Sequence, residues 1–471
     1  MSKSDELLSF DVAALAIKLR AKEISPVELT EAYLAQIERL DETLLAYITV
    51  TADAAREAAR KAEAEITAGK WRGPFHGVPV ALKDLCYTKG LLTTGGSRIL
   101  DEFVPDFDCT LWARLADQGA VLLGKLNLHE FASGATTTNP HWGTCRNPYH
   151  HDSVPGGSSG GSAAAIVAKM AAATIGTDTG GSIRIPAAFC GCVVMKQTWS
   201  RVSRHGVIPL SDSLDHAGPI TRTVRDAALM LQVIAGRDPH DGTSSNEPVP
   251  DYSQAFERDI KGARIGVVTE LTNALSDEVA HSFHLALQHL ADLGAKVEDV
   301  SIPAIEACST IATNIMWAES FEHHEQWMRT QPRDYGFDVR RSLEAGMLTP
   351  VTNYIRSQRA RAVVLAQALD ALEGRIALVA PTASIPAPRI DIGGRALAPG
   401  GSPVNMVTAV LRFTAPFNVT GQPALALPTG MSPEGLPLSM QVIGRPFDES
   451  SVFTVAAAFE KARGPLPEPK L

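Results

Sequence analysis

Two serines in glycine-rich turns are the residues best suited to covalent chemistry. Ser158 stands within the segment 155–162, Pro-Gly-Gly-Ser-Ser-Gly-Gly-Ser, and Ser182 directly follows Thr-Gly-Gly at 179–181. Glycines let the backbone curl, so that successive N–H groups point toward one place where a negatively charged oxygen can be held. A serine beside such groups is a candidate nucleophile, provided that a base removes its proton.

Three other interpretations apply to the segment 155–162. A flexible Gly/Ser linker is one, but the apolar run 163–173 that follows indicates a buried helix. A phosphate-binding loop is another, yet neither the P-loop nor the dinucleotide-binding pattern is complete. Ser159 also fits Gly-x-Ser-x-Gly, the nucleophile turn of α/β-hydrolases, although residues 147–154 before it are polar and not a buried strand. The residues alone leave these alternatives open.

The turn at Ser182 is the better site for a nucleophile. The backbone N–H groups of Thr179, Gly180, Gly181 and Ser182 can surround an anion, as an oxyanion hole requires. The run 183–190 is expected to form a helix whose N-terminus adds positive potential. A tight turn with a purely structural role is the alternative on these letters.

Lys83 is the candidate base because it ends the short apolar strand expected over 78–82. A lysine accepts a proton only when it is neutral, so its pKa must fall by several units, and burial lowers it. Side chains alternate along a strand, so Lys83 and Asp84 should point to opposite faces, which leaves the amine without a carboxylate neighbour. An exposed lysine at the end of a strand is the alternative interpretation.

The two turns and the upstream lysine resemble the amidase signature family, at spacings typical of that family. Its catalytic triad is a strand-end lysine, a serine after a cis peptide bond and a serine after Gly-Gly, which implies these roles for Lys83, Ser158 and Ser182. The segment 195–200, Met-Lys-Gln-Thr-Trp-Ser, departs from the usual Lys-Pro-Thr followed by an aromatic residue and glycine, which puts a turn in doubt. Further similar segments cover nearly the whole chain: 75–79, 127–132, 146–148, 218–222 and 443–446.

The resemblance implies that amide bonds are cleaved through an acyl-enzyme. The nucleophile attacks the carbonyl carbon, and the relay serine passes its proton to Lys83 and later returns a proton to the leaving amine. Ser159 is expected to donate a supporting hydrogen bond. Asp178 and Arg184 flank the second turn, and we interpret them as charges that hold it rather than as catalytic groups.

Two functions fit this chemistry. The first is an amidase that acts, alone or as a homodimer, on a small-molecule amide. The alternative is the glutamine-hydrolysing subunit of a tRNA-dependent amidotransferase. Those subunits usually carry a tyrosine-rich helical segment, which residues 350–356, Pro-Val-Thr-Asn-Tyr-Ile-Arg, do not resemble. Arg361 is a candidate for holding a substrate carboxylate, with an exposed helix arginine as the favoured alternative.

The resemblance leaves the identity of the substrate open. Members of the family hydrolyse aliphatic amides, aryl amides, carbamates and sometimes esters. Large apolar side chains are the candidates for the wall of the pocket, with ordinary core packing as the alternative. They are Phe131, Trp142, Trp317 and Phe321.

The elements that must position these residues alternate between strands and helices. Strands are expected over 78–82 and 120–124, and a buried helix over 163–173. Ser25, followed by Pro-Val-Glu, has the form of a capping box and predicts a helix over 26–40. Strands that alternate with helices of this length are typical of a sheet covered on both faces.

This alternation predicts a single α/β domain over residues 1–471. Its centre should be a twisted, mixed and mostly parallel sheet, covered by helices on both faces in the manner of the amidase signature fold. A signature core is expected over about 75–225. A covering region that forms the substrate pocket is expected over about 240–420, before a C-terminal segment that returns to the core.

Composition limits the classes of partner and cofactor. The 471 residues carry a formal net charge of −9 with no basic run, which argues against a nucleic-acid partner. No apolar run is long enough to span a membrane, and the polar N-terminus does not resemble a signal peptide, so a cytoplasmic protein is expected. The six cysteines show no spacing suited to zinc, so free thiols are expected, with no metal and no organic cofactor.

Overall fold

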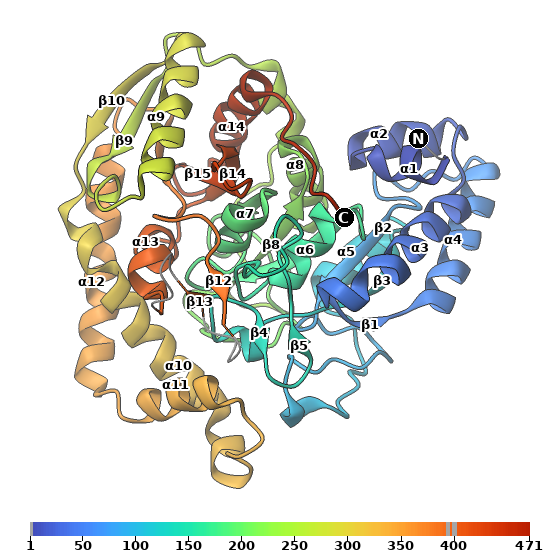
Figure 1. Ribbon diagram of the computed structural model, residues 1–471, viewed down its shortest axis with the longest axis horizontal. Helices are drawn as coiled ribbons and strands as arrows, with labels where there is room; N and C mark the ends of the chain where they lie inside the picture. Colours follow the sequence, from blue (N-terminus) through green and yellow to red (C-terminus); the bar gives the residue numbers. More distant parts are fainter. Residues whose placement is uncertain (1–2, 392–395, 398–402) are drawn as a thin grey trace.

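An eleven-stranded mixed sheet runs through the centre of the protein, whose computed structural model describes residues 3–391, 396–397 and 403–471 (Figure 1). The expected single α/β domain with a mixed central sheet is confirmed, although antiparallel strand pairs outnumber the parallel ones by six to four. From one edge to the other, the strands are β1 (Tyr47–Val50), β3 (Val121–Leu126), β2 (Pro79–Lys83), β6 (Ala173–Asp178), β8 (His216–Thr221), β7 (Val193–Lys196), β14 (Ala424–Met431), β15 (Pro437–Ile443), β11 (Ala377–Pro381), β9 (Arg264–Val268) and β10 (Lys296–Val300). Two short antiparallel pairs lie outside this sheet: β4 (Thr138–Asn139) with β5 (Gly143–Thr144), and β12 (Arg389–Ile390) with β13 (Ala396–Leu397).

Parallel pairing near one edge of the sheet brings the two candidate segments together. Strand β2 pairs in parallel with both β3 and β6, and Leu82 lies opposite Ile175 of β6. The carboxyl ends of parallel strands meet at one edge of a sheet, so Lys83 at the end of β2 lies beside the turn that follows Asp178. Antiparallel pairs continue from β6 through β8, β7, β14 and β15 to β11, and parallel pairs join β11, β9 and β10.

Side-chain alternation along β14 shows how both faces of the sheet are buried. Leu425 and Leu427 pack in the apolar cluster of helix α14 (Glu449–Arg463), whereas Ala426 packs with α6 (Gly160–Val167) and α7 (Arg184–Cys190). Successive side chains of a strand point to opposite faces, so α14 covers one face, and α6 and α7 cover the other. Strands β2 and β6 are buried along their whole length, as expected for strands covered on both sides.

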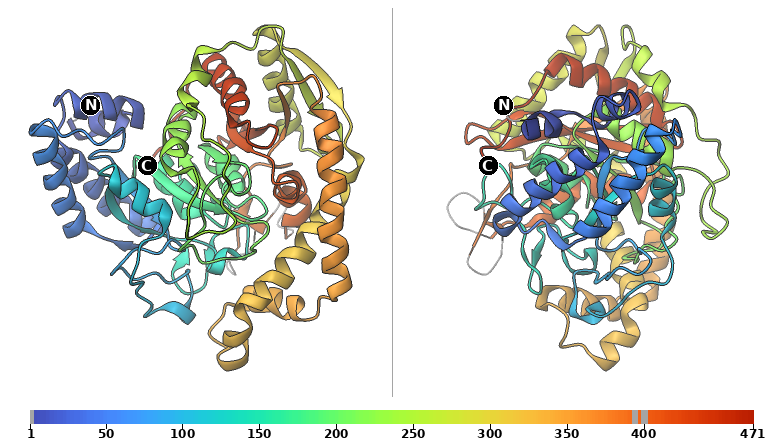
Figure 2. Two further views of the ribbon diagram at one scale, coloured as in Figure 1. Left: turned by 180° about the vertical axis from the view of Figure 1, so that it is seen from behind. Right: turned by 90° about the vertical axis from the view of Figure 1, so that its right-hand side faces the viewer.

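The remaining helices complete these layers and extend beyond them (Figure 2). The helix expected from Pro26 is confirmed, because Ser25 Oγ accepts hydrogen bonds from the N–H groups of Val27 and Glu28. It ends at Leu44, one turn later than expected. Helices α11 (Phe337–Met347) and α12 (Val351–Ala371) both pack on α10 (Cys308–Thr330), and this group projects from one end of the molecule. The other helices of these layers are α1 (Lys3–Ser9), α2 (Val12–Arg20), α3 (Pro26–Leu44), α4 (Ala52–Thr67), α5 (Thr110–Asp117), α8 (Val224–Ile234), α9 (Asp277–Asp292) and α13 (Arg412–Val419).

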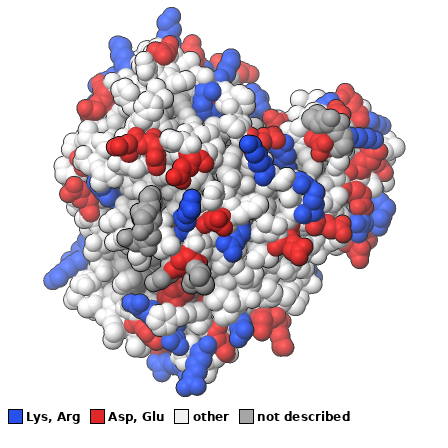
Figure 3. All heavy atoms as spheres, viewed as in Figure 1, with Lys and Arg blue, Asp and Glu red and all other residues white. Residues whose placement is uncertain are grey.

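Charged side chains are dispersed over the surface. Figure 3 shows acidic and basic side chains interspersed over the face that Figure 1 presents. Among the helices that the structure describes, none has the length and apolar character needed to cross a bilayer. All six cysteines are free thiols buried in the interior, in agreement with their scattered spacing.

Candidate active site

The side chain of Lys83 ends among buried hydroxyl groups. Its Nζ lies 2.7 Å from Ser158 Oγ and 2.7 Å from Thr177 Oγ1, and all three residues are buried. Burial lowers the pKa of Lys83 to about 7, although the nearby carboxylates of Asp215 and Asp178 favour the charged form. The neutral amine that a general base requires is therefore populated near neutral pH.

Two other buried lysines have different surroundings. Lys125 Nζ lies 3.1 Å from Asp84 Oδ1, so a carboxylate stabilises its charge. Lys196 donates to the carbonyl oxygen of Gln422 at 2.6 Å, and two further acceptors surround its Nζ. Lys125 also contacts the hydroxyl group of Thr93. Of these three lysines, only Lys83 has two hydroxyl partners and no carboxylate in contact, which suits an amine that takes and returns a proton.

The turn at Ser158 is fixed by contacts from a neighbouring loop. The peptide bond between Gly157 and Ser158 is cis. The N–H of His129 donates to Ser158 O at 3.0 Å, and Thr137 Oγ1 donates to Gly156 O at 2.8 Å. Backbone oxygens on both sides of this bond are thus held by the same loop, while the Ser158 hydroxyl group faces the lysine amine.

The hydroxyl group of Ser159 is bound on both sides by the backbone of Thr177. Its Oγ donates to Thr177 O at 3.2 Å and accepts from Thr177 N at 3.3 Å. The N–H of Ser159 donates to Ser182 O at 3.1 Å, which fastens the two turns together. Ser182 is the more accessible, with 8% of its surface exposed, whereas Ser159 is fully buried. This geometry suits Ser159 as a supporting residue and does not favour the α/β-hydrolase arrangement.

The turn 179–182 presents a row of unused backbone donors. Within the described chain, the N–H groups of residues 179–182 have no protein acceptor, whereas those of residues 183–185 are all bound. Gly181 has a φ of +135°, and a Cβ there would lie 2.2 Å from Thr414 Oγ1, so only glycine fits. Thr414 Oγ1 donates to Gly180 O at 2.5 Å. The turn therefore has the form that an oxyanion hole requires.

A buried ion pair holds the base of this turn. Arg184 donates to the two carboxylate oxygens of Asp178 at 3.0 and 3.1 Å. Burial alone would raise the pKa of Asp178, but the charge and hydrogen bonds of Arg184 hold it below its usual range. The remaining guanidinium donors reach Asn418 Oδ1 at 2.6 Å and Gln441 Oε1 at 3.0 Å. The C-terminal part of the chain thus completes the hydrogen bonds of this pair.

Sequence reasoning missed several groups that hold the amine and the turn. Asp215 Oδ1 accepts from Thr179 Oγ1 at 2.5 Å, and burial raises the pKa of this carboxyl group. Thr177 has a local signal, because it lies in the strand that leads into the turn. Asp215 has no such signal, since it reaches the turn only through the pairing of β8 with β6. The residues missed are Thr177, Asp215, Thr414 and Asn418.

The four aromatic residues expected to line the pocket have packing partners of their own. Phe131 is buried and stacks on an indole ring of α10, with ring centres 5.9 Å apart. Trp317 and Phe321 lie where α10 crosses Gly346 of α11. Trp142 is half-buried, next to the short strand pair β4 and β5. Their contact with a substrate stays a prediction.

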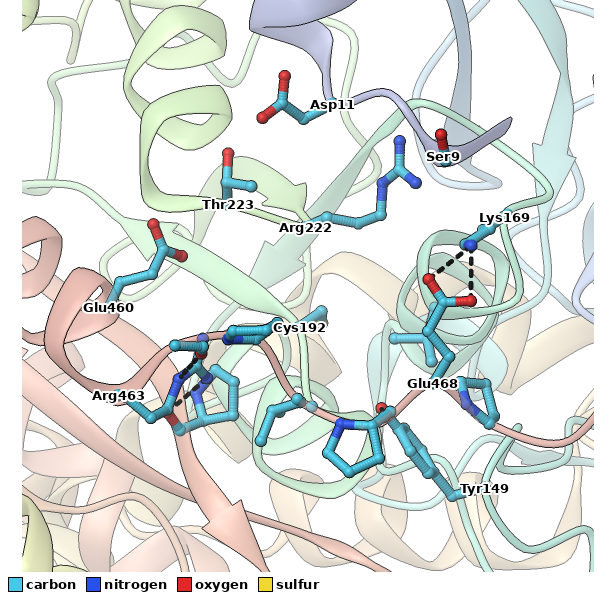
Figure 4. A pocket seen from close by; sticks show the side chains of 18 of the residues that line it. Ser9, Asp11, Tyr149, Lys169, Cys192, Arg222, Thr223, Glu460, Arg463 and Glu468 are labelled. Atoms are coloured by element: carbon cyan, nitrogen blue, oxygen red, sulfur yellow. Dashed lines mark hydrogen bonds and ion pairs between the residues drawn. The ribbon is translucent and has the colours of Figure 1, made fainter. Parts of the chain in front are cut away.

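Two hollows differ in their relation to this site. One of about 270 Å³ is lined by Thr177, Asp215 and His216, so it reaches the groups that hold the amine and the turn. A larger one of about 510 Å³ lies between the N-terminal segment, the end of α14 and the C-terminal residues (Figure 4). Arg222 and Glu460 line it. None of the three candidate catalytic residues lines either hollow. The smaller hollow is the nearer of the two to the site, because Thr177, which contacts the amine of Lys83, is part of its lining.

A sequence model of the family described as Amidase matches residues 28–453. The chain belongs to the amidase signature family. The resemblance of its turns to that family is therefore confirmed, and the amidase is an enzyme that hydrolyses C–N bonds of amides. The individual roles of its site residues remain predictions that the geometry makes specific.

Curated relatives match the amidase over its whole length. A glutamyl-tRNA(Gln) amidotransferase subunit of Geobacter metallireducens is 41% identical, with 97% of this chain and 98% of the relative covered. The corresponding subunit of Moorella thermoacetica is 40% identical, with 97% of both chains covered.

Solved structures show the same similarity. A chain of a vestigial protein complex, linked to the origins of an s-triazine catabolic enzyme, has a TM-score of 0.90 at 32% identity, with 96% and 98% of the chains covered. A solved amidase has a TM-score of 0.87 at 32% identity, covering 97% of this chain and 100% of the other. The glutamyl-tRNA(Gln) amidotransferase subunit of Thermotoga maritima has a TM-score of 0.80 at 34% identity, covering 100% and 98%.

The relatives overturn the expected partners. The sequence favoured a protein that binds only a small-molecule amide, acts alone or as a homodimer, and has no nucleic-acid partner. The curated relatives are by name subunits of a larger enzyme that acts on a glutamyl-tRNA, so this expectation is wrong. The physical reason is that net charge is a sum over the whole surface, whereas a partner binds to one part of that surface, or binds another subunit of the complex.

Proposed function

We propose that the enzyme cleaves carboxamides through an acyl-enzyme on Ser182. Ser182 Oγ attacks the carbonyl carbon, and its proton passes through Ser158 Oγ to the neutral amine of Lys83. The N–H groups of residues 179–182 stabilise the negative oxygen of the tetrahedral intermediate. Lys83 then returns the proton through Ser158 to the leaving nitrogen as the C–N bond breaks. Water releases the acid from Ser182 by the same proton route.

One observation carries this proposal. The amine of Lys83 contacts the hydroxyl group of Ser158 at 2.7 Å and has a pKa lowered to about 7 by burial. Lys83 is thus a proton acceptor that is neutral near pH 7. The hydrogen bond from the N–H of Ser159 to Ser182 O connects the turn that contains Ser158 with the turn 179–182, whose N–H donors are unused. Nucleophile, relay, base and anion site are the parts that acyl transfer needs.

The physiological amide is glutamine, and the enzyme works as one subunit of an amidotransferase, to which it supplies ammonia. Full-length identities of 39–41% to subunits of that name support this proposal. The hollow behind Thr177 supports it as well, because ammonia that is passed on needs a route away from the site.

Arg361 supports a substrate that carries a carboxylate. It is half-buried on α12 and not exposed, which corrects the alternative favoured from the sequence. It donates to Val419 O at 2.9 Å, Gln358 Oε1 at 3.1 Å and Ser213 O at 3.2 Å. A guanidinium group has five N–H donors, so two remain for a carboxylate such as that of glutamine.

A second candidate is direct hydrolysis of a small amide, anilide or carbamate with no transfer of the product. The similarity to a solved aryl acylamidase, with a TM-score of 0.87 at 28% identity, favours it. The segment 350–356, which lacks the tyrosine-rich pattern of amidotransferase subunits, favours it too.

Ammonia release by the purified chain distinguishes the two candidates. Glutamine, asparagine, propionamide and 4-nitroacetanilide are compared, the last by release of the aniline. We expect glutamine to be preferred, and Arg361→Ala to raise KM for glutamine by about 10–100-fold, the value of a hydrogen bond to a charged group. Arg359→Ala, an exposed position on the same helix, is the matched control and should leave KM unchanged. Cleavage of the anilide without hydrolysis of glutamine would favour the second candidate instead.

A further inference from the structure

Lys196 and His216 form a buried pair behind the turn 179–182, and the mechanism above uses neither of them. Lys196 ends β7 and is fully buried, and its Nζ lies 3.2 Å from His216 Nε2. Its other neighbours are the carbonyl oxygens of Gln422 at 2.6 Å and Gln197 at 3.3 Å. Three acceptors surround one nitrogen, which suits the three protons of an ammonium group.

The other ring nitrogen of His216 faces carbonyl groups. Nδ1 lies 2.8 Å from Leu214 O and 3.2 Å from Asp178 O. Carbonyl oxygens cannot donate, so Nδ1 carries the ring proton, and Nε2 of the neutral ring accepts from Lys196. Burial and then the charge of Lys196 hold the pKa of His216 well below its usual range. Burial and then the charge of Arg184 also lower the pKa of Lys196. The geometry nevertheless fits an ammonium group, because three acceptors surround its Nζ, so we place the single positive charge of the pair on Lys196.

The histidine of this pair contacts the first peptide unit of the turn 179–182. The oxygen of Asp178 and the N–H of Thr179 belong to that one peptide unit. Two donors contact the oxygen: Asn418 Nδ2 at 3.0 Å, and His216 Nδ1 at 3.2 Å, whose proton is shared with Leu214 O. A peptide unit is planar, so fixing its oxygen also fixes the direction of its N–H. That direction is what an oxyanion hole must hold before the reaction begins.

The segment in which this chain departs from its family adds a second link between the two strands. Gln197 stands where proline usually follows the lysine, and its Nε2 donates to Ala217 O at 3.0 Å. Ala217 follows His216 in β8, so Gln197 ties the strand of the lysine to the strand of the histidine. The charged groups that face the pair from other elements are Asp178 of β6, Arg184 of α7 and Glu449 of α14.

We propose that Lys196 and His216 are positioning residues that preorganise the Asp178–Thr179 peptide of the oxyanion hole without touching the substrate. Lys196 fixes the tautomer of His216, and His216 holds the peptide oxygen. The proposal rests on the acyl-enzyme at Ser182, and its test is designed so that the two can fail separately.

Three substitutions separate the two contacts of His216. His216→Asn keeps an amide donor near the Nδ1 position, and so the bond to Asp178 O, whereas His216→Gln reaches only toward the Nε2 position. Lys196→Met removes the donor to Nε2 with little change in volume. His76→Asn is the matched control, because His76 is another fully buried histidine, before the opposite end of β2 from Lys83.

The rate at which a fluorophosphonate modifies Ser182 reports on the oxyanion hole without reference to the natural substrate. We expect His216→Gln and Lys196→Met to slow this reaction by about 10–100-fold. Removal of a whole oxyanion-hole donor lowers kcat by about 10²–10³-fold, and these variants only misdirect a donor. His216→Asn and His76→Asn should stay within about threefold of the unmodified enzyme, well short of that loss. With an activated ester, the losses should fall on kcat and leave KM unchanged.

The tautomer of His216 is a readout that a merely structural role would not move. In protein labelled with ¹⁵N-histidine, we expect a neutral ring with its proton on Nδ1 throughout the range from about pH 5.5 to 9, where an ordinary histidine titrates near 6.5. In Lys196→Met the ring should titrate, or populate the other tautomer.

Two results would overturn the proposal: equal losses in His216→Asn and His216→Gln, or a proton on Nε2 in the unmodified enzyme. Should Lys196→Met fail to fold, the tautomer in the unmodified enzyme decides the question alone. An unmodified enzyme that the fluorophosphonate does not label at Ser182 would refute the proposed function instead, which keeps the two failures distinct.

Discussion

The carboxylate of Asp84 lies 3.1 Å from the ammonium group of Lys125, although Asp84 is the residue that follows Lys83 in the chain. Asp84 also accepts hydrogen bonds from the N–H and the hydroxyl group of Thr94. Its charge is therefore engaged away from Lys83, which lacks the close carboxylate that would keep it protonated. Burial then lowers the pKa of Lys83 to about 7.

Replacement of Lys83 should remove amide hydrolysis. We expect Lys83→Ala to lower kcat by about 10⁴-fold or more, comparable with Ser182→Ala, because members of a triad act as a unit. Lys83→Arg should be no better, since a guanidinium group stays charged and cannot accept a proton. Ser158→Ala should cost less, because water can replace a relay but not a base. Single-turnover acylation with an amide measures these losses, and near-normal acylation by Lys83→Ala would place the base elsewhere.

The pH dependence of acylation should follow the amine of Lys83. Only its neutral form accepts a proton, so kcat/KM should rise with an apparent pKa near 7 and level off on the alkaline side. Below that pKa each unit of pH should cost about tenfold. The profile is measured with one neutral amide substrate, and a rate independent of pH across neutrality would contradict the assignment.

The same lysine should make the folded enzyme less stable. Its pKa falls from 10.5 to about 7, so the unfolded chain binds more protons between those values, and stability rises with pH across that window. Lys83→Met should raise the free energy of unfolding at pH 7 by a few kcal/mol, at about 1.4 kcal/mol per pKa unit. The gain should shrink toward pH 10.5. Urea unfolding at two pH values tests this, and a variant less stable than the unmodified enzyme at pH 7 would contradict it.

The nucleophile should be Ser182 and not Ser159. Ser182→Ala should abolish turnover, whereas Ser159→Ala should keep a measurable part of it, because the Ser159 hydroxyl group is bound between the N–H and C=O of Thr177. Peptide mapping of a fluorophosphonate adduct identifies the labelled serine. An adduct on Ser159 would restore the α/β-hydrolase interpretation.

Gly181 should be indispensable to the anion site. Gly181→Ala would place a Cβ 2.2 Å from Thr414 Oγ1 at a φ of +135°, so we expect kcat to fall by about 10²–10³-fold, as for a lost oxyanion-hole donor. Gly180→Ala is the control, since a Cβ there would meet only a leucine side chain at 3.0 Å. Equal activity of the two variants, at equal thermal stability, would argue against the proposed hole.

The sequence predicted the strands, helices and turns that are determined by residues close to one another in the chain. The strand that ends at Lys83, the helix that starts after Ser25 and the two glycine turns all have local signals. Asp215 and Asn418 have none, because strand pairing and the return of the C-terminal segment bring them to the turn.

The burial of Arg361 is a second example of this limit. An arginine on a long helix suggests exposure, but carbonyl oxygens from two distant segments accept its hydrogen bonds. The expectation about partners failed for a related reason, because a summed charge carries no information about where a surface meets another molecule.

The hydrogen bonds that Arg184 makes with Asn418 and Gln441 have a consequence for biosynthesis. While the ribosome is still adding the last part of the chain, the turn beside Ser182 lacks the groups that shape it, and β14 and β15 have not yet entered the middle of the sheet. A nascent chain that has not yet folded these segments into place therefore lacks the shaped turn that acylation requires.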